Sequence, residues 1–317
     1  MASDPEFASP PVRGGGILAR GVRHVYPGGT VALAGIDLEV GTGLFGLLGP
    51  NGAGKSTLMR ILCTLLEPTE GEVRVAGHDV RAERGAVRAA IGYLPQEFGA
   101  WRLHRVEEVL DTLASMSGLA DREVRRKRVA DVLELVGLSA AADRKVKALS
   151  GGMTRRLGVA QALVHAPRVL VVDEPTVGLD PEERLRFRQL MAKIGEDRVV
   201  VLSTHIVADL GSGCRDLALI DRGEIVFRGS PARLVELARG RVVETLVAAH
   251  ADPGAITGLE VVSRVRDGVG IRVRGVVTGE RVPEGASVVE DVTLEEGYLA
   301  FMASRGRADA AHEEVVA

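Results

Sequence analysis

A glycine-rich run starting at Gly49 has the residue types and spacing of a phosphate-binding loop, because it matches the pattern G-x-x-x-x-G-K-S/T. Glycines let backbone N–H groups curve around a phosphate, and a helix starting beside Gly54 points its positive end at the same anion. Lys55 supplies a point charge for the outer phosphates, and Ser56 supplies an oxygen for the Mg²⁺ that accompanies a nucleotide. The predicted loop comprises Gly49, Pro50, Asn51, Gly52, Ala53, Gly54, Lys55, Ser56 and Thr57.

Two adjacent carboxylates, Asp173 and Glu174, close an apolar run that begins at Val169. Ligands of an open α/β sheet bind beyond the carboxyl ends of its strands, which is where this pair would lie. Two neighbouring carboxylates can divide two tasks there, orienting a metal ion and activating a water molecule. An ordinary polar strand end would explain the pair equally well if it stood alone, but the phosphate loop favours the functional interpretation.

Several other positions carry little information alone. Residues 150–152, Ser-Gly-Gly, precede a helical pattern and are typical of a helix N-cap, although the same features suit a second anion site. His205 follows an apolar run, and a lone histidine there is more often structural than catalytic. Gln96 and Tyr26 are equally unremarkable in isolation.

The apolar pattern places the elements that must position these residues. Residues 44–48 are continuously apolar, as in a strand buried on both faces, and a helix is expected from Lys55 to about Leu65. Residues 17–40 alternate around Pro27-Gly28-Gly29 and predict a small antiparallel sheet. Further strands are expected at 72–75, 91–94, 169–173 and 199–202, and a hairpin at 217–227.

Two segments depart from this alternation of strands and helices. From about 98 to 165 apolar residues recur at helical spacing, which predicts a helical insertion. Residues 241–303 combine short valine-rich strands with a helix near Thr293, where Thr293 and Glu296 fit a capping box. We therefore expect an α/β phosphate-loop ATPase core over 17–238 and a small C-terminal α+β domain. Residues 1–16 are expected to be a disordered lead-in, and 304–317 a flexible tail.

The composition narrows the possible classes of protein. A chain of 317 residues suits two domains, and its net charge of −3, with both signs plentiful, argues against a nucleic-acid binder. The two cysteines, Cys63 and Cys214, form neither a disulfide framework nor a zinc site. No stretch approaches the roughly 18 apolar residues of a spanning helix, so any membrane role requires a partner.

The order of these motifs closely resembles the nucleotide-binding subunits of ABC transporters over about residues 17–238. The motifs that carry this resemblance are, in chain order, Tyr26, the loop 49–57, Gln96, Leu149-Ser150-Gly151-Gly152, Asp173-Glu174, Asp180 and His205. One small departure is Met153, where the family often has glutamine. No expected catalytic position is missing, so the resemblance implies active ATP hydrolysis.

The resemblance implies a role for each matching residue. Tyr26 would stack on adenine, while Lys55, Ser56 and Thr57 would hold phosphates and Mg²⁺. Asp173 would position the metal ion, and Glu174 would act as the general base.

Two further roles connect the site to partners. Gln96 would sense the metal and the attacking water and link the site to a transport partner, and His205 would touch the γ-phosphate. Ser150, Gly151 and Gly152 would contact ATP bound to the opposing subunit, so a homodimer would complete two shared sites.

The run 149–162, together with 180–184 and 203–205, looks most like the bacterial exporter branch that moves antibiotics, polysaccharides, lipids or peptides. The acidic segment 291–296 is similar to the end of the small C-terminal extension that ATPases of this branch commonly carry. A separate membrane-spanning permease would then hold the chain at the inner face of the cell membrane, on the cytoplasmic side. The cargo would touch only the permease.

Two other interpretations stay open. The same engine could serve a non-transport ATPase acting on nucleic acid or the ribosome, for which the five basic residues of 122–128 are the only hint. A solvated helix face explains those residues better, because acidic residues dilute the run. The C-terminal domain could regulate or sense a ligand, although a dimer-stabilising appendage is favoured.

Overall fold

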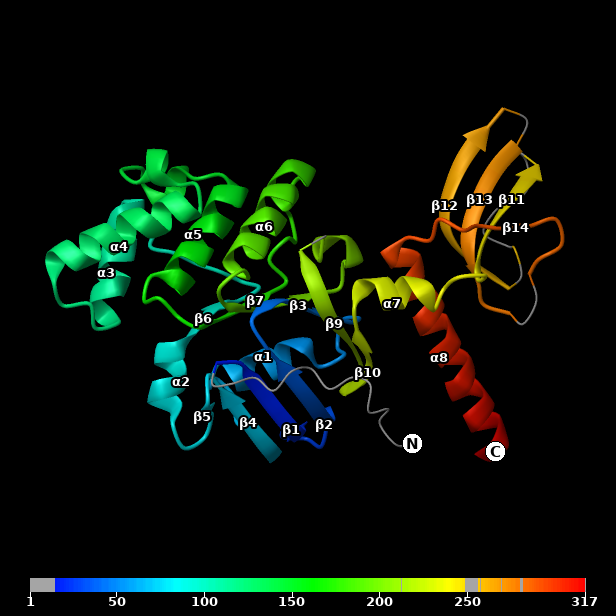
Figure 1. The fold of residues 1–317 in the computed structure, drawn as a ribbon, viewed down its shortest axis with the longest axis horizontal. Coiled ribbons are helices and arrows are strands. Elements are labelled where there is room, and N and C mark those ends of the chain that lie inside the picture. Colours follow the sequence, from blue (N-terminus) through cyan, green and yellow to red (C-terminus); the bar gives the residue numbers. More distant parts are fainter. Residues whose placement is uncertain are drawn as a thin grey trace. The chain divides into compact units, whose positions relative to one another are not determined.

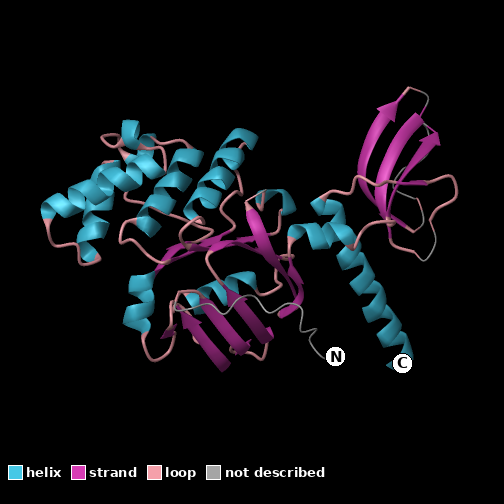
Figure 2. Cartoon of the chain, in the orientation of Figure 1, coloured by secondary structure: helices cyan, strands magenta, loops and turns pink. Residues whose placement is uncertain are grey.

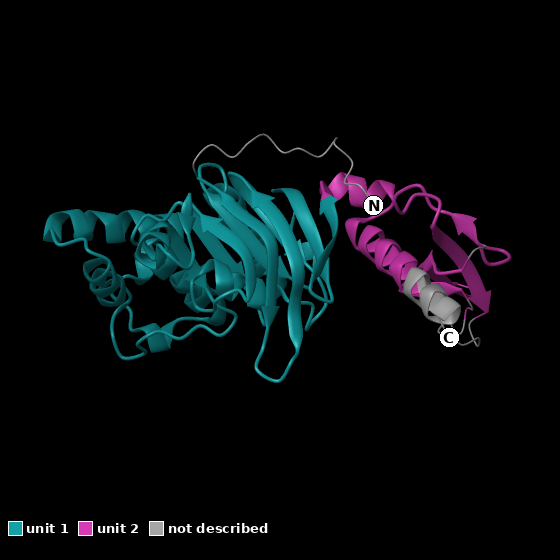
Figure 3. Cartoon of the chain, turned by 90° about the horizontal axis from the view of Figure 1, so that it is seen from below, with its two compact units in different colours: residues 1–228 teal, residues 229–317 magenta. Residues whose placement is uncertain are grey.

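The chain divides into two compact units, residues 1–228 and 229–317, which are coloured separately in Figure 3. The computed structural model describes residues 15–316 except 212, 249–255, 257, 269, 280 and 281, and describes only the backbone of 307–316. The expected disordered lead-in therefore lies largely outside the described residues.

A six-stranded sheet forms the centre of the first unit (Figure 1). Its strands run in the order β10-β9-β3-β8-β7-β6, and β9, β3, β8, β7 and β6 pair in parallel. Every residue of β7 and β8 is buried, as expected of parallel strands covered on both faces. The strands are β3 Gly43–Leu48, β6 Ile91–Leu94, β7 Val169–Asp173, β8 Val199–Thr204, β9 Cys214–Asp221 and β10 Glu224–Gly229.

The register of these parallel strands brings three loops to one edge of the sheet. Leu48 pairs with Thr204 across β3 and β8, and Asp173 pairs with Ser203 across β7 and β8. The residues that follow each strand therefore leave the sheet side by side, because parallel strands share a carboxyl edge. The segments beginning at Gly49, Glu174 and His205 meet there.

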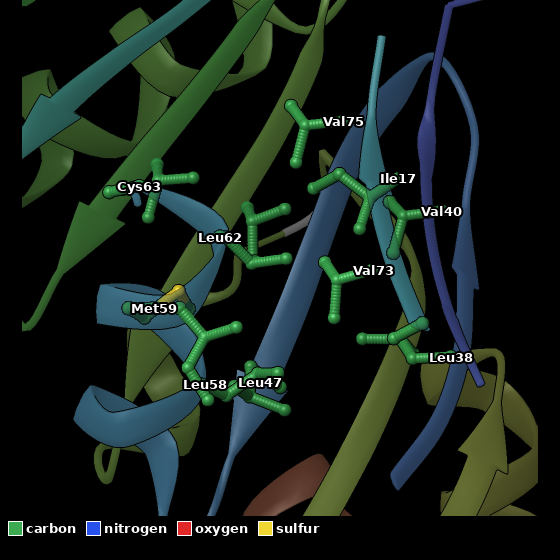
Figure 4. Packing of buried hydrophobic residues seen from close by; sticks show 14 of the residues in the cluster. Ile17, Leu38, Val40, Leu47, Leu58, Met59, Leu62, Cys63, Val73 and Val75 are labelled. Carbon is green, nitrogen blue, oxygen red and sulfur yellow. The ribbon is translucent and has the colours of Figure 1, made fainter. Parts of the chain in front are cut away.

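A second, antiparallel sheet lies on the side of the central sheet that α1 covers (Figures 1 and 2). Apolar side chains from β1, β2 and β4 pack against α1 and β3, and Figure 4 shows this packing around Leu58, Met59 and Leu62. This core fixes α1, whose first three residues are the last three of the phosphate-type loop. The elements are β1 Ile17–Val25, β2 Val31–Val40, β4 Glu70–Val75, β5 His78–Asp79 and α1 Lys55–Leu62.

The first unit also contains an insertion that is predominantly helical. α3 and α4 contact α5, and α5 in turn contacts β6. Asp121 caps α4 and Ser150 caps α5, each accepting a hydrogen bond from a backbone N–H of the first turn. The helices are α2 Arg84–Ala90, α3 Val106–Met116, α4 Arg122–Leu135, α5 Gly151–Leu163 and α6 Pro181–Ile194, with short 3₁₀ turns at Ser139–Ala141, Val146–Ala148 and Val207–Asp209.

The second unit is a four-stranded antiparallel sheet with two helices. Its strand order is β12-β13-β11-β14, and α8 contacts both β13 and α7. Ala238, Val242, Val276 and Ala300 form an apolar cluster between the sheet and the helices. The elements are α7 Pro231–Glu236, β11 Val242–Ala248, β12 Leu259–Asp267, β13 Gly270–Val277, β14 Ser287–Val288 and α8 Leu294–Val316.

Two boundaries differ from those expected from the sequence. The units divide at 228/229 rather than at 238–241, because α7 packs on α8 so closely that a Cβ on Gly297 would lie 2.9 Å from the carbonyl oxygen of Leu234. The segment from 304, expected to be a flexible tail, instead continues α8 to Val316. The core fold is as predicted. Among the described residues, none of the helices is both long and apolar enough to cross a membrane.

Candidate active site

The glycine-rich loop follows β3 and has a shape that only glycine allows at two points. A Cβ on Gly49 would lie 2.2 Å from the carbonyl oxygen of Ile220. Gly54 has φ +108°, and a Cβ there would lie 2.6 Å from the carbonyl oxygen of Ala32. The glycines of the pattern are therefore needed because the loop lies directly against neighbouring backbone.

The N-terminus of α1 is free to receive an anion. Gly54 provides no side-chain cap, and no acidic residue occupies the first turn. The first N–H groups of a helix lack intrahelical acceptors, and the helix dipole places positive charge at the same end. The loop and helix end open into a cavity of about 650 Å³.

That cavity gathers most of the residues selected from the sequence. Its lining includes Tyr26, Asn51, Gly52, Gly54, Lys55, Ser56, Thr57, Gln96, Glu174 and His205. Gly49, Pro50 and Ala53 support the loop without lining the cavity. Thr30, Val31, Ala32 and Val177 complete the wall.

Lys55 is buried at the base of the cavity and is held by the loop itself. Its Nζ donates to the carbonyl oxygens of Gly49 at 2.7 Å and Pro50 at 3.1 Å. Nζ also lies 3.2 Å from Oε1 of Glu174, and the two side chains are only 4% and 8% exposed. A buried cation therefore lies beside the free helix end, paired with the carboxylate that follows β7.

Glu174 occupies an unusual backbone conformation. Its φ is +45°, in the left-handed region that non-glycine residues seldom adopt. Its N–H points back at β8, with the carbonyl oxygen and Oγ of Ser203 at 3.1 and 3.3 Å. Such outliers persist where the surroundings impose them, and they concentrate at functional sites.

His205 lies on the other side of the Glu174 carboxylate. Its Nδ1 is 3.0 Å from Oε2 of Glu174. An ionised carboxylate can only accept a hydrogen bond, so Nδ1 is the donor in this contact. The imidazole is 38% exposed, which leaves it accessible to a molecule in the cavity.

Asp173 lies one residue before Glu174 and is buried. Its Oδ1 accepts a hydrogen bond from the Ser203 hydroxyl, and Asp173 is not part of the cavity lining. The oxygens of Ser56, Gln96 and Asp173 are hard donors of the kind that Mg²⁺ prefers. Among the described residues no group of three or more acidic, histidine or cysteine side chains could hold a metal ion. This donor set suits Mg²⁺ bound jointly with phosphate oxygens rather than in a protein cage.

Tyr26 and Gln96 form part of the cavity wall. The Tyr26 hydroxyl is 3.2 Å from Oγ1 of Thr57, and its ring meets that of His24 edge to face with centroids 4.6 Å apart. The backbone carbonyl of Gln96 accepts a hydrogen bond from Nη1 of Arg155 at 2.9 Å, which connects this loop to α5. The Tyr26 side chain and the Gln96 backbone are thus anchored by neighbours of their own unit.

Residues 150–152 are not part of this cavity. The Ser150 hydroxyl accepts from the N–H of Met153 at 3.2 Å and caps α5. A Cβ on Gly152 would lie 2.1 Å from the Glu183 carboxylate on α6. The structure of a single chain therefore does not bring Ser150, Gly151 and Gly152 to the phosphate-type loop.

The cysteine near the site is unsuited to thiolate chemistry. Burial, reinforced by the charge of Asp173, raises the pKa of the Cys63 thiol far above its usual value. Burial also raises the pKa of Cys214 to about 11. Both thiols are therefore protonated structural groups at neutral pH.

Sequence reasoning missed four residues that support the site. Ser203 binds both acidic residues, His24 packs on Tyr26, and Thr176 and Asp209 form a buried hydrogen bond nearby. Ser203 could have been selected because it precedes His205 at the same strand end. His24 lies two residues before Tyr26 but shows no pattern that marks it, and the hydrogen bond between Thr176 and Asp209 joins distant segments, for which the sequence carries no signal.

Comparison with known proteins identifies the family. A family model described as ABC transporter matches residues 33–177. The Nod factor export ATP-binding protein I of Cupriavidus metallidurans is 37% identical over 219 residues, which cover 68% of this chain and 72% of that protein. The chain belongs to the ABC transporter ATP-binding proteins.

Other ABC transporter ATP-binding proteins extend the comparison. The probable multidrug ABC transporter ATP-binding protein YbhF of Escherichia coli is 37% identical over 227 residues. That match covers 71% of this chain but only 39% of YbhF, so the chain spans well under half the length of that relative.

A solved structure supports the fold class. The dimeric ATP-binding cassette MJ0796, described in a post-hydrolysis state with ADP and Pi, matches with a TM-score of 0.61 at 28% identity. The match covers 68% of this chain and 98% of that cassette. The predicted family and fold class are both confirmed.

Proposed function

We propose that this ABC protein binds and hydrolyses ATP to power a membrane transporter, as one of two identical nucleotide-binding subunits. The observation that carries the proposal is the convergence of Lys55, Glu174 and His205 on one cavity at the free N-terminus of α1. A polyphosphate needs such a cationic, N–H-rich end, and its hydrolysis needs a carboxylate beside it.

Phosphate binding follows from the loop. The N–H groups at the start of α1 and the Lys55 ammonium would hold the β- and γ-phosphates, and Lys55 would exchange Glu174 for a phosphate oxygen. Tyr26 on the cavity wall would stack on adenine. Ser56, Asp173 and Gln96 would hold Mg²⁺ with the phosphates, and the ion would neutralise charge on the transferred group.

Once Lys55 contacts a phosphate oxygen, the Glu174 carboxylate would be available as the base for hydrolysis. Glu174 would accept a proton from a water molecule as the water oxygen bonds to the γ-phosphorus and the bond to the bridging oxygen of ADP breaks. His205 is hydrogen-bonded to the same carboxylate, and it would touch the γ-phosphate and fix the position of Glu174. The products are ADP and inorganic phosphate.

A second copy of the chain would complete each site. Residues 150–152 do not line the cavity of their own chain, yet the start of α5, where Ser150 caps the N–H of Met153, would form another anion-binding helix end. The similar cassette MJ0796 is described as dimeric. ATP held between the phosphate loop of one copy and residues 150–152 of the other would draw the two copies together.

A separate permease is the proposed membrane partner, and export is the proposed direction. The similar protein of Cupriavidus metallidurans is named for Nod factor export, and YbhF is named a probable multidrug protein. Trp101 and Leu103, on the loop that follows Gln96, are 45% and 70% exposed. An exposed aromatic and an exposed leucine on this loop would suit docking of a permease segment at the inner membrane face.

The alternative partner, nucleic acid, gains no support from α4. Arg125 pairs with Asp111, and Arg128 donates to backbone carbonyls of residues 163 and 164. Two of the five basic side chains thus serve the fold of the insertion. That nucleic acid is not a partner stays a prediction, which salt-sensitive RNA or DNA binding by the purified chain would contradict.

The replacement Glu174→Gln tests the proposal. The steady-state rate of phosphate release should fall by roughly 10²- to 10⁴-fold, the usual contribution of a general base, while MgATP still binds and promotes dimer formation in size-exclusion chromatography. Glu134→Gln, an exposed carboxylate on α4, is the matched control and should hydrolyse ATP normally. Wild-type turnover by Glu174→Gln would contradict the role of this carboxylate as the general base. Purification of the chain from native membranes tests the role in transport, and failure to recover a multi-spanning membrane protein with it would contradict that role.

A further inference from the structure

A buried carboxylate ties together the two loops that carry Glu174 and His205. Asp209 ends the 3₁₀ turn Val207–Asp209 and is only 2% exposed. Its Oδ2 accepts hydrogen bonds from the hydroxyl of Thr176, two residues after Glu174, and from the hydroxyl of Thr204 at 3.1 Å, one residue before His205. A single oxygen atom therefore joins the segment after β7 to the segment after β8.

The direction of these hydrogen bonds is fixed by their surroundings. The Thr204 hydroxyl accepts from the N–H of Ile206 at 2.9 Å, and its own hydrogen can be donated to Oδ2 of Asp209 at 3.1 Å or to the carbonyl oxygen of Ile206 at 3.3 Å. Thr176 and Thr204 are each 1% exposed. Removing the carboxylate leaves the buried Thr176 hydroxyl without this acceptor, where such a loss is costly, and leaves the Thr204 hydroxyl only its contact with Ile206.

The same link holds the strained turn at Glu174. Glu174 has φ +45°, and the residue two positions later is the one anchored to Asp209. Three consecutive residues of β8 and its end, Ser203, Thr204 and His205, contact the acidic segment directly or through Asp209. An energetically unfavourable backbone conformation persists only where its surroundings impose it. The hydrogen bond from Thr176 to Asp209 fixes the segment that follows Glu174.

We propose that Asp209 is a positioning residue for ATP hydrolysis, which sets the geometry of Glu174 against His205 by anchoring Thr176 and Thr204. This inference rests on the proposed function, because it assumes that the Glu174 carboxylate takes part in hydrolysis. Asp209 is not itself part of the cavity lining, so it acts through its two threonine partners. Its loss should impair turnover and leave nucleotide binding intact.

The test compares Asp209→Ala and Thr176→Val with two conservative variants. Asp209→Ala removes the acceptor and Thr176→Val removes one donor at equal size, so each should lower kcat by roughly tenfold or more, as small misplacements of reacting groups do. The dissociation constant of a non-hydrolysable ATP analogue should stay that of the wild type. Thr176→Ser keeps the hydroxyl and Asp209→Asn keeps one acceptor oxygen, so both should recover most of kcat.

Two controls make the outcome decisive. Asp121→Ala removes the N-cap of α4, away from the cavity, and should lower the Tm while kcat is retained. The double variant Asp209→Ala/Thr176→Val should be no slower than the slower single variant, since both break one link.

If Asp209→Ala matches Asp121→Ala, with a lower Tm and full kcat, or if it weakens analogue binding, Asp209 is not a positioning residue. Normal hydrolysis by Glu174→Gln would instead overturn the proposed role of Glu174, and with it the positioning role of Asp209, even if Asp209→Ala lowers kcat.

Discussion

Glu174 in the first unit and Glu296 in the second are both buried carboxylates paired with a cation. Lys55 approaches Glu174 at 3.2 Å, and Arg274 forms the ion pair with Glu296. Their surroundings differ. Glu296 receives hydrogen bonds from Nε and Nη2 of Arg274 and from the N–H and hydroxyl of Thr293, which together close the start of α8. Glu174 borders a cavity and sits in a strained backbone turn.

The pKa of the second carboxyl reflects its many donors. Burial alone would raise the pKa of Glu296, but the hydrogen bonds from Arg274 and Thr293 outweigh it and lower the pKa below its usual value. A carboxylate surrounded by protein donors stabilises the fold, whereas one bordering a cavity has a side to offer a ligand. The presence of a buried ion pair therefore does not show whether it serves stability or ligand binding. The other groups that surround the carboxylate show it.

The largest expected effect is on the stability of the second unit. Arg274→Met leaves the Glu296 carboxylate buried without its cation, and breaking a buried pair in this way costs about 3–5 kcal/mol. Differential scanning calorimetry should show a transition at lower temperature, while ATP hydrolysis at 20 °C or below is retained. Arg272→Met, an exposed neighbour on β13, is the control and should change little. If the transition temperature of Arg274→Met equals that of the wild type, the Arg274–Glu296 pair does not stabilise the second unit, and its contrast with the Lys55–Glu174 pair fails.

The corresponding change in the first unit should affect binding instead. Lys55→Met removes a charge-assisted contact to phosphate that is worth about 1.5–3 kcal/mol, equivalent to a loss of ATP affinity of roughly 10- to 150-fold. Titration with a fluorescent ATP analogue measures it. Lys127→Met, on the exposed face of α4, should bind as the wild type does. Loss of the first unit's thermal stability with unaltered affinity would mean that the Lys55–Glu174 pair is structural too.

A smaller effect is expected at the rim of the cavity. Tyr26→Ala removes the proposed stacking partner of adenine and should weaken ATP binding by about 1–2 kcal/mol, within the range measured for base–aromatic stacking. Tyr26→Phe keeps the ring but loses the hydroxyl contact to Thr57, so it should bind almost normally. Competition with triphosphate alone measures the contribution of the phosphates to binding, so it can be separated from that of the adenine base. If Tyr26→Ala and the wild type bind ATP with equal affinity, adenine does not stack on Tyr26.

The smallest expected effect is a dependence of stability on pH confined to the second unit. The pKa of Glu296 is lower in the folded chain than in the unfolded one, so the folded state binds fewer protons. The stabilisation is complete above about pH 4.3 and is lost as the pH falls through the lowered pKa. Calorimetry between pH 7 and pH 3 should show this, with a flatter profile for Glu296→Gln. Identical profiles would assign the acid sensitivity to other carboxylates.

Local sequence patterns predicted the parts of both sites that lie close together in the chain. The loop 49–57 and the capping box of Thr293 and Glu296 were both expected, and the hydrogen bonds at Thr293 confirm the box. Arg274 could not be predicted as the partner of Glu296, because it belongs to a strand whose register depends on the whole sheet. The flexible tail was wrong for a related reason, since charged residues after 304 do not reveal that α8 continues.

The cavity shows the same limit. The shared carboxyl edge of parallel strands was enough to place Glu174 near the loop, and the structure brings them together. The positive φ of Glu174 and the role of Asp209 depend on how two loops fold against each other, which no residue spacing encodes. The expected contacts of residues 150–152 concern a second copy and stay a prediction.

The pair between Lys55 and Glu174 would carry a free-energy cost for binding if Lys55 contacts phosphate as proposed. Nζ of Lys55 would leave Glu174 as it contacts a phosphate oxygen, so the free energy of the internal pair would reduce the affinity of the loop for a polyphosphate. Binding would then exchange one anion for another, and it would release the carboxylate when hydrolysis requires a proton acceptor.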